Sequence, residues 1–265
     1  QNYKIDDIKN LSDFVQLHFT KVLYDTSDSW VILSDIEQSI KSKIEAIGTP
    51  LKEWDIQINY GIKTGYNDAF IITTEKRNEI LAHCLDDAER ERTAELIRPI
   101  LRGRDIKRYS YDWAGLWLIN THNGVKGKLS PIDINDYPSV KQYLDLHWEK
   151  IKKREDKGIT PYNLRNCAYM DDFNKPKILW KRVGSILRFS YDDTRKLGLD
   201  STCFATGTDI AYICCVLNSP MGHFLLKDAP KTGTGDLLIS VQAVEPIKIP
   251  QLEDTTIFTT FLQQY

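Results

Sequence analysis

Several features that would assign a simple function are missing from this 265-residue sequence. The five cysteines form no Cys-x-x-Cys pair, so neither zinc-site spacing nor a disulfide framework is encoded. No apolar run approaches the roughly 20 residues that a membrane helix needs. The start, Gln1-Asn2-Tyr3-Lys4, has no signal-peptide pattern and no initiator methionine, so we expect a piece of a longer polypeptide. These absences favour a reducing, cytoplasmic location and no membrane partner.

Positive charge is also scarce, since the net charge is −2. This counts against a simple basic DNA-binding protein, because phosphate contacts supply most non-specific affinity. The charges are unevenly spread, however. Ten acidic residues face six basic ones in residues 1–60, five basic residues face only Asp105 in residues 98–108, and seven basic residues face two acidic ones in residues 174–196. The asymmetry predicts one basic face on an acidic body, although ordinary solvated surfaces explain it equally well.

What is present is enough apolar material for a packed core, because 42% of the residues are hydrophobic. Periodicity and capping signals predict helices at 6–24, 34–47, 75–85, 138–158, 210–217 and 221–227. Alternating or short apolar runs predict strands at 54–60, 69–72, 116–119, 177–180 and 186–191. Mixed strands and helices without regular alternation predict an α+β fold.

A polar loop at residues 61–67 joins two of these strands and offers what entry into a DNA groove requires. Gly61 and Gly65 allow close approach of the backbone. The lysine is a point charge for phosphate or guanine, the threonine and asparagine can donate to phosphates or base edges, and the tyrosine can stack. The alternative is a tight turn that happens to be polar. The candidate DNA contacts in this loop are Lys63, Thr64, Tyr66 and Asn67.

Three further segments supply candidate contacts. Arginine is the commonest reader of guanine and a strong phosphate clamp, and strand alternation can place cations beside a groove. A glycine-rich loop at residues 231–235 is a second candidate reading loop. For Arg102 and Arg104, the alternative is ion pairing with the acidic run at residues 86–95. The candidates are Arg102, Arg104, Lys107, Arg108, Lys181, Arg182, Arg188, Lys231 and Thr232.

No catalytic or metal-binding residue is predicted. The Gly233-Thr234-Gly235 fragment lacks the third glycine of a nucleotide-binding loop. Glu155-Asp156-Lys157, with Asp145 upstream, has the spelling of a metal-dependent nuclease motif, but charged residues are common at the polar end of a helix. No nucleophile-elbow motif accompanies the five scattered histidines.

Several blocks, in a fixed order, resemble the TaqI-like C-terminal specificity domain. The most specific are residues 61–72 and residues 100–109, the latter reading Ile-Leu-Arg-Gly-Arg-Asp-Ile-Lys-Arg-Tyr. The other blocks are residues 30–51, 175–178, 216–220 and 247–250. In that family the domain is the DNA-reading part of adenine-N6 methyltransferases and of type IIG restriction-modification enzymes.

The resemblance implies a target recognition domain with an α+β fold, room for two subdomains, and a face turned toward a catalytic domain across a DNA cleft. Residues 1–52 would be a connecting helical segment from a methyltransferase domain, and residues 53–265 the target recognition domain. The expected partners are double-stranded DNA and the methyltransferase domain of the same polypeptide.

The chain itself is expected to be neither an enzyme nor a cofactor-binding protein. The glycine-rich cofactor loop and the Asn-Pro-Pro-Tyr motif that grips a flipped adenine are both missing. S-adenosylmethionine, and a divalent metal where the parent also cleaves DNA, would bind elsewhere in the parent. Two other classes stay open: a protein-interaction module on the same scaffold, which the net acidity favours, and a free-standing metal-dependent nuclease.

Overall fold

The computed structural model describes residues 10–18 and 33–265 and divides the chain into two compact units. The first unit holds the described part of Gln1–Gly48 together with Lys248–Gln251. The second unit holds Thr49–Ile247 and Leu252–Tyr265. The remainder of the helix predicted at 6–24, and the start of the block at 30–51, lie outside the described residues.

The first unit contains α1 (Leu11–His18), α2 (Asp35–Ile47) and β12 (Lys248–Ile249). The predicted cap of α2 is confirmed, because the Ser34 side chain accepts from the Glu37 backbone while the Glu37 side chain accepts from the Ser34 backbone. No residue of α2 is buried.

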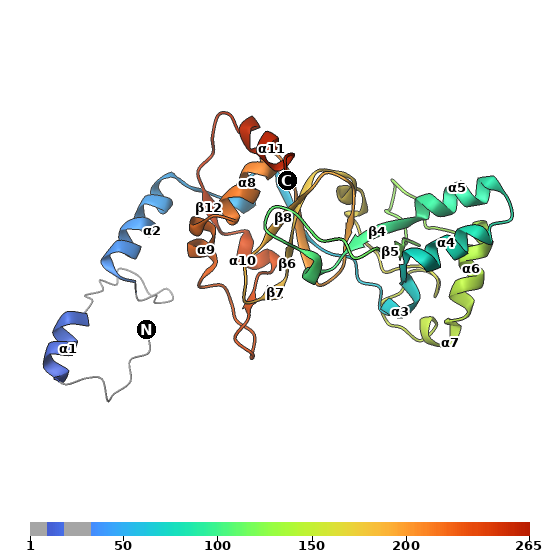
Figure 1. Ribbon diagram of the computed structural model, residues 1–265, viewed down its shortest axis with the longest axis horizontal. Coiled ribbons are helices and arrows are strands. Elements are labelled where there is room, and N and C mark those ends of the chain that lie inside the picture. The colour runs from blue at the N-terminus through green and yellow to red at the C-terminus, as the bar shows by residue number, and fades with distance from the viewer. Residues whose placement is uncertain (1–9, 19–32) are drawn as a thin grey trace. The chain divides into compact units, whose positions relative to one another are not determined.

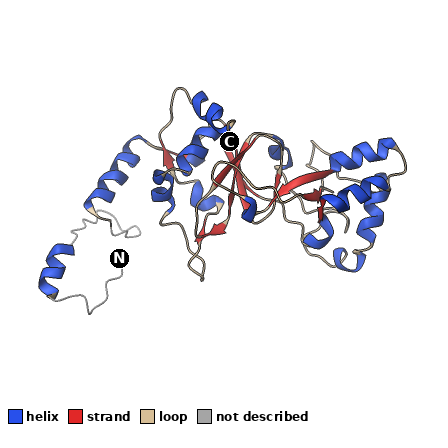
Figure 2. Ribbon diagram, viewed as in Figure 1, coloured by secondary structure: helices blue, strands red, loops and turns tan. Residues whose placement is uncertain are grey.

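One four-stranded antiparallel sheet organises part of the second unit (Figures 1 and 2). Its strand order is β2 (Ile56–Tyr60), β10 (Thr202–Gly207), β6 (Lys177–Lys181), β8 (Phe189–Asp192). Helix α8 packs on β6 and β8, and α11 packs on α8. The helices nearest this sheet are α8 (Ile210–Leu217), α9 (Pro220–Leu226), α10 (Val241–Val244) and α11 (Thr256–Leu262).

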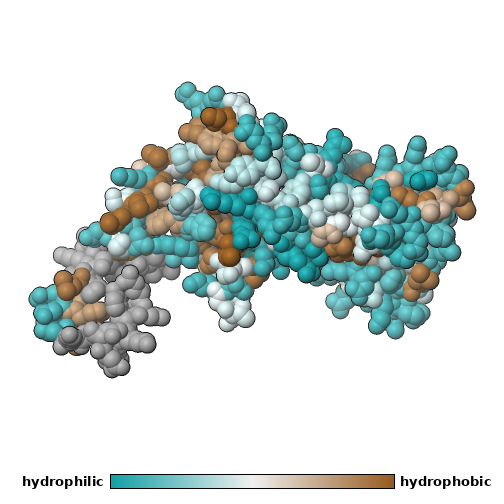
Figure 3. All heavy atoms as spheres, in the orientation of Figure 1, coloured by the Kyte–Doolittle hydropathy of each residue, from teal (hydrophilic) through white to brown (hydrophobic). Residues whose placement is uncertain are grey.

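A second four-stranded sheet has the order β3 (Ile71–Thr73), β5 (Leu116–Ile119), β4 (Ile97–Leu101), β9 (Leu197–Gly198). Its pairs are antiparallel except for β4 with β9. The helices around it are α3 (Asn67–Phe70), α4 (Thr74–Ala82), α5 (Asp87–Leu96), α6 (Pro138–Asp145) and α7 (Trp148–Ile151). Figure 3 shows mostly hydrophilic residues over α4, α5 and α6, as expected for helices that cover a sheet with one face only.

Short elements complete the second unit. Strands β7 (Val183–Gly184) and β11 (Leu237–Leu238) form an antiparallel pair, and β1 spans Thr49–Pro50. The 3₁₀ helices span Leu51–Glu53, Gly103–Asp105, Ile134–Asp136 and Met170–Asn174.

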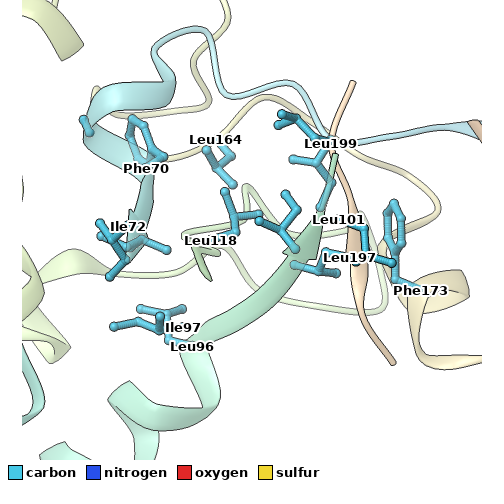
Figure 4. Packing of buried hydrophobic residues seen from close by; sticks show 14 of the residues in the cluster. Phe70, Ile72, Leu96, Ile97, Leu101, Leu118, Leu164, Phe173, Leu197 and Leu199 are labelled. Atoms are coloured by element: carbon cyan, nitrogen blue, oxygen red, sulfur yellow. The ribbon is translucent and has the colours of Figure 1, made fainter. Parts of the chain in front are cut away.

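One hydrophobic core connects the two sheets of the second unit. It runs from Phe70 and Leu118 at the second sheet, through Leu101, to Phe173 (Figure 4). Phe173 stacks on Phe204 of β10, with ring centroids 4.2 Å apart. Because both sheets contribute to this cluster, they are parts of one folded body rather than two independent cores.

The structure corrects several predicted boundaries. The strand predicted at 69–72 begins only at Ile71, because Ala69 and Phe70 belong to the helical turn α3. Both residues are fully buried, and a short buried apolar run reads the same in a helix and in a strand. The strand predicted from residue 186 begins at Phe189, since Ile186 is exposed.

One helix prediction is also corrected, and one helix start has an unusual cap. The helix predicted at 138–158 is two short helices, α6 and α7, separated by a turn. Asp209 precedes α8 but does not cap it with its side chain, because it adopts a left-handed conformation (φ 54°). Its carboxylate instead accepts a hydrogen bond from Thr255, at 2.6 Å.

Candidate nucleic-acid interface

The 61–67 loop is held in place by a close backbone approach at one end and a side-chain bond at the other. The Gly61 amide donates to the Thr202 carbonyl at 3.0 Å, and a Cβ atom at residue 61 would lie 2.0 Å from the Leu199 carbonyl oxygen. At the other end, the buried Thr64 hydroxyl donates to Asn67 Oδ1 at 2.6 Å. Glycine is therefore required at residue 61. The Thr64 hydroxyl is buried and donates its hydrogen bond within the protein.

Buried Arg154 fixes this loop from behind. Its guanidinium donates to the carbonyl oxygens of Thr64, Asp156, Pro161 and Asn163. It also lies over the Phe70 ring, 4.3 Å from the centroid. Burial lowers the pKa of Arg154 to about 10, so the group is still a cation at neutral pH.

Two cations share one carboxylate beside the loop. Lys63 Nζ lies 2.7 Å from Asp156 Oδ2, and Arg165 Nη1 lies 3.3 Å from Asp156 Oδ1. Both cations are about half exposed, with Lys63 at 51% and Arg165 at 60% of the side-chain area. They line a hollow of about 570 Å³, here called the first hollow. Its lining residues are Tyr60, Gly61, Ile62, Lys63, Arg165, Asn166, Cys167, Ala168, Tyr169, Arg182 and Asp200.

A second hollow of about 210 Å³ gathers three of the predicted cations, Arg104, Lys181 and Arg188. No acid is among the described residues that line it: Gly103, Arg104, Ile106, Lys181, Gly184, Ser185, Ile186 and Arg188. The Gly103 amide donates to Ser201 Oγ at 3.0 Å, which brings this segment against the end of β6. Lys181 and Arg182, which are consecutive in the chain, line the second and the first hollow respectively.

A third hollow of about 910 Å³ lies at residues 123–131. Asn166 and Ala168 line both the third and the first hollow, so the third hollow is contiguous with the first. It adds Lys126 and Lys128 to the cationic lining. These two lysines and Arg165 are not among the residues predicted from the sequence, although Gly124 and Gly127 within a polar run are a signal for the lysines.

Arg102 is placed differently from its neighbour Arg104. Its Nε and Nη2 atoms both bond the Asp105 carboxylate, at 3.0 and 2.7 Å, and Asp105 is only 4% exposed. This hydrogen bonding raises the pKa of Arg102 above its ordinary value. Arg102 does not pair with the acidic run at residues 86–95, which was the alternative prediction. Arg102 therefore forms a structural ion pair with Asp105 in this conformation.

The other predicted contacts are spread over different places. Lys107 pairs with Asp112 at 3.1 Å, and Arg108 lies 5.1 Å from the centroid of the Tyr109 ring. Tyr66 is half-buried and packs edge-on against His147. Lys231 and Thr232 lie in a hairpin loop that projects beyond β7 and β11 (Figure 1). None of these residues lines any of the three hollows described above.

Lys177, counted among the cations of residues 174–196, does not reach the surface. It and Asp192 are both fully buried and form an ion pair at 2.6 Å. Burial alone would raise the pKa of Asp192, but the Lys177 charge and hydrogen bonds from Lys177, Thr194 and Tyr111 hold it below its ordinary value. This segment therefore presents one cation fewer at the surface than its sequence indicates, while its net charge is unchanged because Asp192 is buried with Lys177.

The nuclease-like spelling has no matching geometry. Within residues 10–18 and 33–265, no group of three or more His, Cys, Asp or Glu side chains is arranged to hold a metal ion. Asp156 is paired with two cations, and Asp145 pairs with Lys141 at 2.7 Å. Over the same residues, no helix has the length and apolar character that crossing a membrane takes.

Comparisons with known proteins agree with this fold. The chain is 25% identical over 246 residues to the type II methyltransferase M.BstVI of Geobacillus stearothermophilus, covering 86% of the chain but only 39% of that relative. It resembles the solved type IIL restriction-modification enzyme MmeI in complex with DNA, with a TM-score of 0.54 and 13% identity, over 82% of this chain and 28% of that one. It also resembles the type IIG restriction endonuclease BpuSI, with a TM-score of 0.54 and 12% identity, over 86% of this chain and 27% of that one.

The predicted α+β fold and the predicted family are thus both confirmed. The family comparison matches residues 98–245, which is more than half of the chain. This chain belongs to the family of TaqI-like C-terminal specificity domains.

Proposed function

We propose that this chain is the sequence-specific DNA-recognition domain of an S-adenosylmethionine-dependent adenine-N6 DNA methyltransferase or type IIG restriction-modification enzyme. It would position the duplex for base flipping by a catalytic domain elsewhere in the same polypeptide. The observation that carries this proposal is the gathering of cations from distant segments around the first and second hollows, three at each. These cations are Lys63, Arg165, Arg182, Arg104, Lys181 and Arg188.

Two kinds of contact follow from this arrangement. Arg104, Lys181 and Arg188 line a hollow without acidic residues, which suits them to phosphates and to positioning. The 61–67 loop, held by Arg154, suits base reading through Asn67, with Lys63 beside it for a phosphate and with Thr64 and Tyr66 shaping the loop. The hairpin loop with Lys231 and Thr232 is the second candidate for base reading.

The named relatives support this assignment. M.BstVI is a methyltransferase, and MmeI was solved with DNA bound. The chain spans only 39% of the length of M.BstVI, which leaves room for a catalytic domain in the parent. We propose that residues 1–52 connect to that domain, that residues 53–265 form the recognition domain, and that S-adenosylmethionine and any catalytic metal bind in the parent outside this chain.

A titration of duplex DNA at two salt concentrations tests the proposal. Affinity should fall steeply between about 50 and 200 mM salt, by about 0.9 log unit per phosphate contact per log unit of salt. If all six cations touch phosphates, the total slope is about 5. The triple variant Arg104→Ala, Lys181→Ala, Arg188→Ala removes the cations of the second hollow. We expect the slope of its affinity against salt concentration to be smaller by about 3.

A protein-interaction module on the same scaffold is the second candidate, and the net charge of −2 favours it. Absence of duplex binding at low salt, or binding that does not respond to salt, would support that candidate instead. A free-standing nuclease would cleave DNA in the presence of a divalent metal, and an assay with Mg²⁺ separates it from both.

A further inference from the structure

We propose that Lys63 and Arg165 form one binding site for a DNA backbone phosphate, and that the Asp156 carboxylate occupies this site in the free protein. The inference rests on the proposed function, because it concerns the surface assigned there to DNA.

The contacts of Asp156 are those expected of a bound anion. Each of its two carboxylate oxygens faces a different cation, Lys63 at 2.7 Å and Arg165 at 3.3 Å. A phosphodiester also carries two charged oxygens that can face two donors. The carboxylate is 21% exposed, while the two cations are 51% and 60% exposed, so an incoming phosphate can reach both cations.

The backbone of Asp156 is fixed by Arg154, whereas its carboxylate is held by two cations that are about half exposed. Arg154 Nη1 donates to the Asp156 carbonyl at 2.9 Å, and a Cβ atom at residue 65 would lie 3.0 Å from the Asp156 Cβ and carbonyl oxygen. The carboxylate can therefore turn away by rotation of its side chain without moving the 61–67 loop. Ion pairs exposed to this extent contribute little to stability and exchange easily in water.

The carboxylate is charged under physiological conditions. The hydrogen bond from Lys63, together with the charges of Lys63 and Arg165, holds the pKa of Asp156 below its ordinary value, although burial acts in the other direction. An isolated phosphate must therefore compete with a full negative charge. A duplex that also contacts Arg182 and the second hollow can displace it, because several contacts then form together.

The consequence is weaker non-specific binding. Phosphate contacts are sequence-independent, so removing the internal competitor should strengthen binding to any duplex. This differs from a purely structural role, in which loss of the Asp156 charge would disturb the loop and weaken binding.

The test compares Asp156→Asn with Asp145→Asn in the full chain. Both substitutions remove one negative charge, but Asp145 pairs with Lys141 of α6, which lines none of the three hollows, whereas the partners of Asp156, Lys63 and Arg165, line the first. The probe is a short fluorescein-labelled duplex of mixed sequence. At about 50 mM salt, Asp156→Asn should bind about three- to tenfold more tightly than the unaltered chain, and Asp145→Asn less than about twofold more tightly.

Two double variants test whether the increase in affinity for the duplex depends on the two cations. Adding Lys63→Ala or Arg165→Ala to Asp156→Asn should abolish the increase. Inorganic phosphate at matched ionic strength should displace the duplex no better than chloride, because a single phosphate lacks the additional contacts.

The outcomes separate the two proposals. If the unaltered chain binds the duplex but Asp156→Asn binds no more tightly than Asp145→Asn, this inference fails while the proposed function stands. An increase that survives both Lys63→Ala and Arg165→Ala would also overturn it. If no variant binds the duplex, the proposed function fails, and this inference with it.

Discussion

Arg154 donates a hydrogen bond from Nη1 to the carbonyl oxygen of Thr64, 90 positions earlier in the chain. The same side chain bonds the carbonyls of Asp156, Pro161 and Asn163. One buried cation thus links the 61–67 loop to the segment that follows α7. A candidate DNA-reading loop is held by main-chain contacts, while the side chains of Lys63 and Asn67 are exposed and contact Asp156 and Thr64 respectively.

Replacement of this arginine tests that link. We expect Arg154→Met to lower the free energy of unfolding by about 3 kcal/mol, since several buried carbonyl groups lose their donor. Arg165→Ala removes an exposed arginine nearby and should change it by less than about 0.5 kcal/mol. Urea unfolding of the two variants measures both, and equal stabilities would contradict the role given to Arg154.

Arg102 and Arg104 should behave differently although the sequence places both in one basic segment. Arg102→Ala leaves the buried Asp105 carboxylate without its bidentate partner, so we expect a loss of about 2 kcal/mol in stability. Arg104→Ala should leave stability unchanged but weaken binding to every duplex and lower the salt slope by about 0.9. Thermal unfolding and fluorescence titration distinguish them; a stable Arg102→Ala chain with weaker DNA binding would reverse the assignment.

Acid should destabilise the protein through Asp192. Its folded pKa is lower than the ordinary 3.8, so its contribution is fully present above pH 3.8 and is lost as the pH falls through the folded value. Asp192→Asn should therefore be less stable than the unaltered chain at neutral pH and should lose less stability between about pH 4 and pH 2. Urea unfolding across this range is the measurement, and parallel curves for the two proteins would exclude this contribution.

Base reading by the 61–67 loop is tested in the full-length parent. We expect Asn67→Ala to reduce discrimination between target and near-target DNA by about 1–3 kcal/mol, because base contacts carry specificity. Asn78→Ala, at an exposed asparagine of α4, is the matched control and should leave the ratio of methylation rates unchanged. If the Asn67 variant also keeps the ratio, the hairpin loop with Lys231 and Thr232 becomes the candidate to substitute next.

The chain alone should not bind S-adenosylmethionine, since the glycine-rich cofactor loop and the Asn-Pro-Pro-Tyr motif are missing from its sequence. Isothermal titration calorimetry should detect no heat of binding at micromolar cofactor. Micromolar affinity would overturn the proposal that the cofactor binds elsewhere in the parent.

The sequence by itself determined the family, the α+β class and the elements with strong local signals. Helix α2 begins at the predicted cap, and α8 and β5 have the predicted bounds, because capping chemistry and apolar periodicity act within a few residues. Shorter apolar runs did not distinguish a helix from a strand, because they contain too few residues to show a period. Ala69 and Phe70 were predicted to lie in a strand and lie in a helical turn, because burial of a short apolar run is compatible with either backbone conformation.

Only the tertiary structure decided which cations are available to a ligand. A lysine in the sequence looks the same whether it is solvated, like Lys181, or buried against a carboxylate, like Lys177. Asp156, read in sequence as part of a nuclease-like triplet, is instead the shared partner of Lys63 and Arg165. The free energy of a charge depends on its solvation and on the distance to opposite charges, and both are set by segments that meet only when the chain folds.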